Sequence, residues 1–154
     1  GTSMNMTLLN GDYLLLLSNT FYTSPQQGDI VVISKDSFDN GNAFVKRIIA
    51  TEGQTVDIDF EAGIVYVDGA AMEEPYVNTL TNVSGGVQFP LTVEEGCIFA
   101  MGDNRSISKD SRYPDIGLID TREILGKAIF LVIPGTNTIR DPQQRDFTRI
   151  GVIR

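Results

Sequence analysis

One short stretch, residues 44–50, limits what this chain can fold into more than any other. It reads Phe-Val-Lys-Arg-Ile-Ile-Ala, which places two adjacent cations inside an apolar run that favours a β-strand. Side chains alternate between the faces of a strand, so Lys46 and Arg47 point oppositely and one of them shares its face with apolar neighbours. Burial lowers the pKa of an amine, which makes Lys46 a candidate base. The alternative is an exposed edge strand whose lysine discourages aggregation.

Short apolar runs separated by turn formers recur along the chain and predict a mostly β fold. Such runs favour antiparallel strands joined by turns. The predicted strands are residues 13–17, 30–34, 44–51, 56–59, 64–67, 97–101 and 124–133. Residues 13–17 are so uniformly apolar that we expect burial on both faces, or one face kept for a ligand or a membrane surface.

The 154 residues, of which 42% are hydrophobic, suit one domain with a sizeable core. Residues 52–94 read as compact hairpins without candidate chemistry. We interpret them as a small β lobe inserted into a catalytic β core formed by residues 1–51 and 95–154. The alternative is that residues 52–94 continue the same sheet. Asp120 and Glu123 have the spacing of a capping box.

Composition excludes several classes of function. The net charge of -8 would repel nucleic acid. Every apolar run is far shorter than the ~20 residues that span a bilayer. The absence of histidine removes Ser-His-Asp triads, Cys-His pairs and nearly all catalytic zinc sites, and we expect neither a metal nor a cofactor. Cys97 is the only cysteine and is expected to be a small core residue.

Three separated stretches remain as candidates for chemistry: Ser3 with Met4, Lys46 with Arg47, and the loop of residues 102–112. The loop follows an apolar strand and concentrates small, charged and hydroxyl residues, as functional loops on rigid scaffolds do. Without histidine, a nucleophilic serine needs another proton acceptor, and a desolvated lysine is the available one.

These stretches resemble, in order, the motifs of the type I signal peptidases, membrane-anchored Ser-Lys proteases that remove signal peptides from exported proteins. Ser-Met-Asn-Met-Thr-Leu at residues 3–8 is similar to the family's nucleophile box, and residues 45–50 are similar to the segment with its general base. Gly-Asp at residues 11–12 and 28–29 resembles the Gly-Asp pairs that precede two strands in this family. Residues 102–112 resemble the family's most diagnostic loop. The resemblance implies an antiparallel β catalytic domain of the signal-peptidase type.

The resemblance also implies roles for individual residues. Ser3 would be the nucleophile, Lys46 the base, and Ser108 the hydroxyl that orients the lysine, unless Ser108 only stabilises a turn. Structural support would come from Arg47, Asp103, Asn104, Asp110 and Arg112, with the last two as an ion pair. Shallow apolar pockets for the small residues of an Ala-x-Ala-like cleavage site would be lined by Met4, Leu8, Phe44 and Val45, although these four also suit a plain core.

Two positions depart from the family pattern. Gly1 stands where some members carry a hydroxyl that assists the Ser3 backbone amide in holding the oxyanion, so that hydroxyl is absent here. Met6 replaces the usual proline, which loosens the backbone without removing a catalytic group.

The resemblance implies a location and partners as well. The partners would be signal peptides of secreted preproteins and the membrane lipid surface, which residues 13–17 would help to meet. The location would be the extracytoplasmic face of the cell membrane, with this chain a soluble fragment that lacks its transmembrane anchor.

Two other functions stay open at this point. A catalytically impaired relative, acting as a binding or assembly module, would fit the departures at Gly1 and Met6. A self-cleaving Ser-Lys peptidase would share the chemistry but would need a scissile segment within its own chain.

Overall fold

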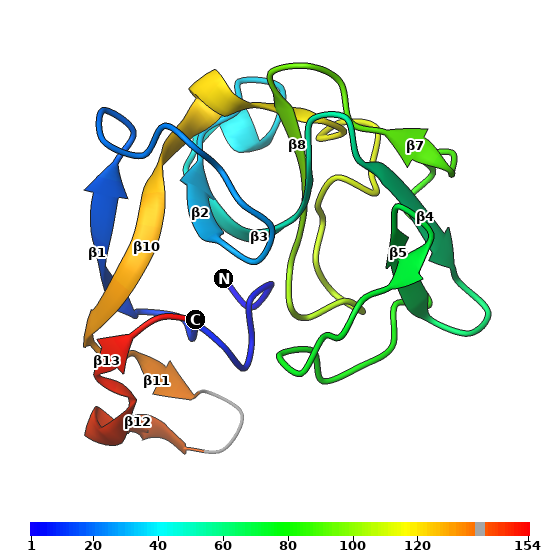
Figure 1. Cartoon of the computed structure of the whole chain (residues 1–154). Helices are drawn as coiled ribbons and strands as arrows, with labels where there is room; N and C mark the ends of the chain where they lie inside the picture. Colours follow the sequence, from blue (N-terminus) through cyan, green and yellow to red (C-terminus); the bar gives the residue numbers. More distant parts are fainter. Residues whose placement is uncertain (138–140) are drawn as a thin grey trace.

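A computed structural model describes residues 1–137 and 141–154, which form antiparallel sheets and short 3-10 turns but no α-helix (Figure 1). The mostly β fold predicted from the short apolar runs is therefore confirmed. None of the described residues lies in a helix long and apolar enough to cross a membrane.

The largest sheet has seven strands and carries the predicted core strands. Its path runs β1-β10-β2-β3-β8-β9, with β13 paired to β10. The strand bounds are β1 Tyr13–Ser18, β2 Ile30–Ile33, β3 Phe44–Thr51, β8 Cys97–Met101, β9 Ile119–Asp120, β10 Ile124–Ile133 and β13 Gly151–Val152.

Two smaller sheets and three 3-10 turns complete the described chain. The four-stranded sheet has the order β6-β5-β4-β7, and β11 pairs with β12. Their bounds are β4 Thr55–Asp59, β5 Ile64–Val67, β6 Ala70–Ala71, β7 Leu91–Thr92, β11 Thr136–Asn137 and β12 Asp141–Arg145, and the turns are η1 Asp39–Gly41, η2 Thr121–Glu123 and η3 Phe147–Arg149. The predicted capping box of Asp120 and Glu123 is present at η2.

The four-stranded sheet takes all its strands from residues 52–94, and the seven-stranded sheet takes none from there. The two sheets nevertheless share one apolar core. Val56 and Val65 from the small sheet are buried together with Ile49 and Phe99 from the large one. The division into a catalytic core and an inserted lobe stays a prediction, and "the lobe" below means residues 52–94.

Strand β3 lies between β2 and β8, in the interior of the large sheet. The alternative of an exposed edge strand for Lys46 is therefore wrong. Both cations are buried, Lys46 at 3% exposure and Arg47 at 2%, whereas alternation alone required this of only one. A central strand covered on both faces explains the difference, because neither face is open to water.

Strand β1 corrects a second expectation. Tyr13 is 63% and Leu15 52% exposed, so burial on both faces is wrong and the strand leaves apolar side chains uncovered. The reason is that β1 pairs only with β10 within the described sheet and is its outer strand. Cys97 is likewise only partly buried, because it begins β8 at the end of the sheet, where it packs against the shared core.

Candidate active site

The segment before β1 turns back on itself and presents Ser3 to the large sheet. Met4 and Leu8 are buried side chains on this segment, and the Leu8 amide donates to the Met4 carbonyl at 2.9 Å. Both side chains pack in one apolar cluster with Ile30 and Ala128. Burial of Met4 and Leu8 against the sheet fixes the turn and places Ser3 next to β3.

Lys46 reaches Ser3 from β3. Its Nζ atom lies 2.8 Å from Ser3 Oγ and 3.2 Å from the Val45 carbonyl oxygen. The pKa of Lys46 is lowered to about 8, chiefly by desolvation. The carboxylate of Asp110 opposes this shift, the charge of Arg112 adds to it, and the carboxylate of Asp103 opposes it. An amine with this pKa is neutral in about one molecule in ten at pH 7, so it can accept a proton near physiological pH.

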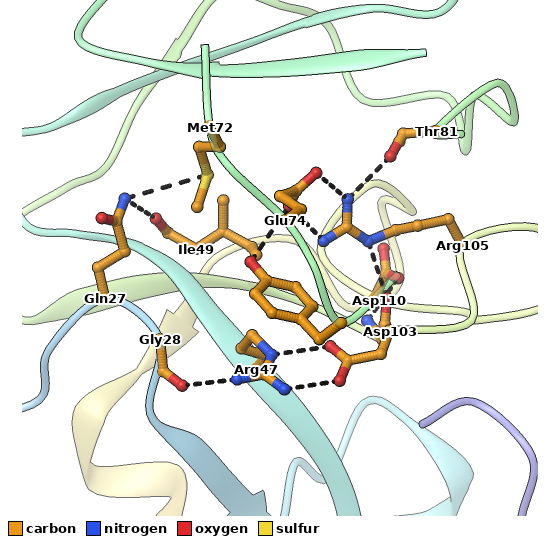
Figure 2. A network of polar contacts seen from close by, with 12 residues as sticks. Gln27, Gly28, Arg47, Ile49, Met72, Glu74, Thr81, Asp103, Arg105 and Asp110 are labelled. Carbon is orange, nitrogen blue, oxygen red and sulfur yellow. Dashed lines mark hydrogen bonds and ion pairs between the residues drawn. The ribbon is translucent and has the colours of Figure 1, made fainter. Parts of the chain in front are cut away.

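Arg47 points to the other face of β3 and holds the loop after β8. Its Nε and Nη2 atoms donate to the two carboxylate oxygens of Asp103 at 2.9 and 2.7 Å, and Nη1 donates to the Gly28 carbonyl at 3.0 Å (Figure 2). Asp103 also accepts a hydrogen bond from the Thr7 hydroxyl at 2.5 Å. One buried ion pair thus connects β3, the loop of residues 102–112 and the segment that carries Ser3.

The rest of the loop is held by buried polar contacts. Asp110 and Arg112 form an ion pair at 2.9 Å with both side chains fully buried. The Asn104 amide donates to the Ser3 carbonyl at 2.9 Å, and its side chain donates to the Thr2 carbonyl at 3.1 Å. A buried charge is stable only when it is paired and hydrogen-bonded, which makes this loop rigid.

Ser108 is buried beside Ser3, close to the backbone of Gly102. Its hydroxyl donates to the Lys109 carbonyl at 3.4 Å, and the described residues show no hydrogen bond between Ser108 and Lys46. The orienting role expected for Ser108 therefore stays a prediction.

A pocket of about 390 Å³ opens beside Ser3. Its walls include the four residues expected to bind substrate, which are Met4, Leu8, Phe44 and Val45. Met4 and Leu8 are also core residues, so pocket wall and core are the same side chains at this place. The described residues contain no group of three or more His, Cys, Asp or Glu side chains that could hold a metal ion.

Sequence reasoning missed the contribution of the lobe to this site. The Tyr76 ring covers the Arg47 guanidinium at 3.8 Å, and Glu74 pairs with Arg105 at 2.6 Å. Thr81 accepts from Arg105 at 2.8 Å. One signal was available, since a buried arginine needs an acidic partner and Asp110 of the same loop was already assigned to Arg112.

A serine hydroxyl beside a desolvated lysine and a pocket, on an antiparallel β scaffold, is the arrangement that hydrolases of the Ser-Lys class use. The family described as "Signal peptidase, peptidase S26" matches residues 1–133. The chain belongs to this family, and it is a serine protease.

Individual relatives agree. The probable signal peptidase I-1 of Synechocystis sp. is 36% identical over 141 residues, which cover 87% of this chain and 68% of the relative. The signal peptidase I of Bacillus licheniformis is 36% identical over 142 residues, covering 87% and 74%. A crystal structure of a signal peptidase I from Enterococcus faecalis has a TM-score of 0.54 and 31% identity, covering 68% of this chain and 97% of that chain. The expectation of a signal-peptidase fold is confirmed.

Proposed function

We propose that this protein removes N-terminal signal peptides from exported preproteins, with Ser3 as nucleophile and Lys46 as general base. Signal-peptide removal is the activity of the family to which the chain belongs. The observation that carries the residue assignment is the 2.8 Å contact between Ser3 Oγ and the desolvated Lys46 Nζ.

The reaction follows from this pair. Neutral Lys46 accepts the Ser3 hydroxyl proton while Oγ attacks the scissile carbonyl carbon and forms a tetrahedral intermediate. The intermediate collapses to an acyl-enzyme, and Lys46 returns the proton to the leaving amine, which is the new N-terminus of the mature protein. Water then attacks the ester with Lys46 again as base, and the signal peptide leaves with a free carboxylate.

The oxyanion of the intermediate needs hydrogen-bond donors. The Ser3 backbone amide is available, since it has no hydrogen-bond partner among the described residues. Gly1 contributes no hydroxyl here. The Ser3 carbonyl is held by the Asn104 amide at 2.9 Å, which keeps the adjoining backbone in place.

The pocket beside Ser3 suits small apolar side chains. Its volume is about 390 Å³, and its lining includes Met4, Leu8, Phe44 and Val45. A shallow apolar wall favours alanine-sized groups over large or charged ones. We propose that these four residues select an Ala-x-Ala-like sequence before the cleaved bond.

The remaining site residues support this geometry without touching the reacting atoms. Arg47 and Asp103 join the base strand to the loop, and Asp110 with Arg112 holds the loop itself. Ser108 is buried close to Gly102, and its hydroxyl would orient Lys46 by accepting an N–H of the amine, which leaves the lone pair of the neutral amine to face Ser3.

We also propose that the protein works at the extracytoplasmic face of the cell membrane and touches the lipid surface. The support is the uncovered apolar surface of β1 and its neighbours. Tyr13 pairs across the sheet with Ile133, and both are exposed. Such a surface marks a contact with another molecule or a membrane.

The test is to incubate the protein and a preprotein with an Ala-x-Ala site in detergent and to measure the product masses. Cleavage after the second alanine is expected for the wild type, and none for Ser3→Ala or Lys46→Met. Ser37→Ala, at an exposed serine, and Lys127→Met, at a half-buried lysine paired with Asp29, are controls outside the site and should cleave normally. Wild-type cleavage by either site variant would overturn the assignment.

A further inference from the structure

The lobe sends one segment, which includes Glu74 and Tyr76, across to the candidate active site. Glu74 follows β6 in the chain, and its side chain points toward Arg105 in the loop of residues 102–112 (Figure 2). Its carboxylate accepts hydrogen bonds from Arg105 Nη1 at 2.9 Å and Nη2 at 2.6 Å. The Tyr76 ring lies over the Arg47 guanidinium, with its centroid 3.8 Å away. Neither residue touches Ser3 or Lys46 in the described contacts.

These contacts hold the Arg47–Asp103 pair from two sides. The Tyr76 ring covers one face of the guanidinium, so it fixes the plane in which Arg47 meets both oxygens of Asp103. Arg105, held by Glu74, donates from Nε to the Gly102 carbonyl at 2.9 Å, which is the peptide that leads into Asp103. The carboxylate and its backbone are thus both restrained through the lobe.

The position of Asp103 matters for Lys46. Three charged groups act on the amine, which are Asp110 and Arg112 from the loop and Asp103 from the ion pair with Arg47. Asp110 is held by Arg112, which the lobe meets through backbone atoms, the Val83 carbonyl at 2.9 Å and the Val87 amide at 3.0 Å. Asp103 is therefore the carboxylate that side chains of the lobe restrain. A carboxylate released from its arginine would favour the charged form of a nearby lysine.

The geometry points to Tyr76 and Glu74 as positioning residues, supplied by the lobe, that keep Asp103 paired with Arg47 so that Lys46 can be neutral. The inference rests on the proposed role of Lys46 as base. It gives the lobe a part in the reaction, although the lobe offers no group to the reacting atoms.

The test is the pH profile of kcat/KM for a signal-peptide substrate in detergent, measured for Tyr76→Leu. Removal of the ring is expected to shift the rising limb of this profile to higher pH, by about half a pH unit to one pH unit. The rate at pH 7 then falls about three- to tenfold, and the alkaline plateau stays unchanged. Burial raises the pKa of the Tyr76 phenol to about 12, so the phenol itself does not titrate in this range.

Three further variants make the result specific. Tyr76→Phe keeps the ring over Arg47 and removes only the 3.4 Å hydrogen bond from the phenol to Glu74, so it should keep a profile close to that of the wild type. Tyr66→Leu removes a partly buried lobe tyrosine from β5 and should leave the limb in place. Glu74→Gln should shift the limb in the same direction by a smaller amount, and it provides a second reading if Tyr76→Leu is poorly folded.

An equal loss at every pH, or an unmoved limb in both Tyr76→Leu and Glu74→Gln, would overturn the inference and leave the proposed function intact. A wild-type profile with no rising limb would instead refute Lys46 as base, and the inference with it.

Discussion

Burying the Lys46 side chain costs the folded protein free energy at neutral pH. Its pKa is about 8 when folded, against 10.5 for the ordinary side chain. Between these two pH values the unfolded chain holds a proton that the folded protein lacks, so stability rises with pH across this window. Below pH 8 the full cost is present, on the order of 3 kcal/mol. The protein therefore keeps a buried lysine at position 46 although this lysine lowers the stability of the fold at neutral pH.

Lys46→Met should consequently stabilise the protein while it removes activity. The variant is expected to gain about 2 to 3 kcal/mol in free energy of unfolding at pH 7, and the gain should shrink toward zero near pH 11. Urea unfolding at several pH values measures this. A Lys46→Met variant that is less stable than the wild type at pH 7 would show that burial does not penalise this amine.

The loop after β8 depends on a close approach of backbone and side chains at Gly102. A Cβ atom at this position would overlap the Ser108 side chain and the Ser3 carbonyl oxygen, and both neighbours are held by buried contacts. No positive φ is involved, so the requirement is for space alone.

Gly102→Ala is therefore expected to push the Ser3 segment away from Lys46. We expect a loss of about 1 to 3 kcal/mol in stability and at least about a hundredfold in kcat/KM, as overpacking at a reacting geometry gives. Gly1→Ala is the matched control, since nothing lies within 4 Å of a Cβ added there. Unchanged kcat/KM in Gly102→Ala would show that Ser3 is not held through this contact.

Strands were predictable because β-prone apolar runs bounded by turn formers leave little choice, and Phe44–Thr51 and Ile124–Ile133 were found where expected. What covers a strand was not predictable. The apolar run of β1 reads like a buried strand, yet its exposure depends on its outer place in the sheet. The contacts of Glu74 and Tyr76 were not predictable for a similar reason. Their partners lie about 30 residues away in the chain, and only the fold brings them together.

Charge and apolar surface are separated across the molecule. No lysine or arginine lies between Arg47 and Arg105, so the whole lobe is acidic. Strands β1, β10 and β13 lie away from the lobe, at the other end of the large sheet (Figure 1). They carry exposed apolar side chains, among them Tyr13, Leu15 and Val152. An anionic lipid surface would repel the lobe and accept the other end, which would orient the site relative to the membrane.

This arrangement predicts weaker membrane binding when the apolar end is charged. Leu15→Asp and Val152→Asp, at positions 52% and 70% exposed, should each lower co-flotation with anionic vesicles by roughly tenfold. Leu80→Asp, an equally exposed leucine in the lobe at 61%, is the control and should bind as the wild type does. Equal binding of all four proteins would count against a lipid contact at this end.

If neutral Lys46 activates Ser3, the rate of Ser3 acylation by a serine-directed electrophile should follow the deprotonation of the Lys46 amine. The rate should rise with pH to a plateau with an apparent pKa near 8, and Lys46→Met should react at least about a hundredfold more slowly at every pH up to the plateau. Acylation that is independent of pH, or equally fast without Lys46, would contradict the account.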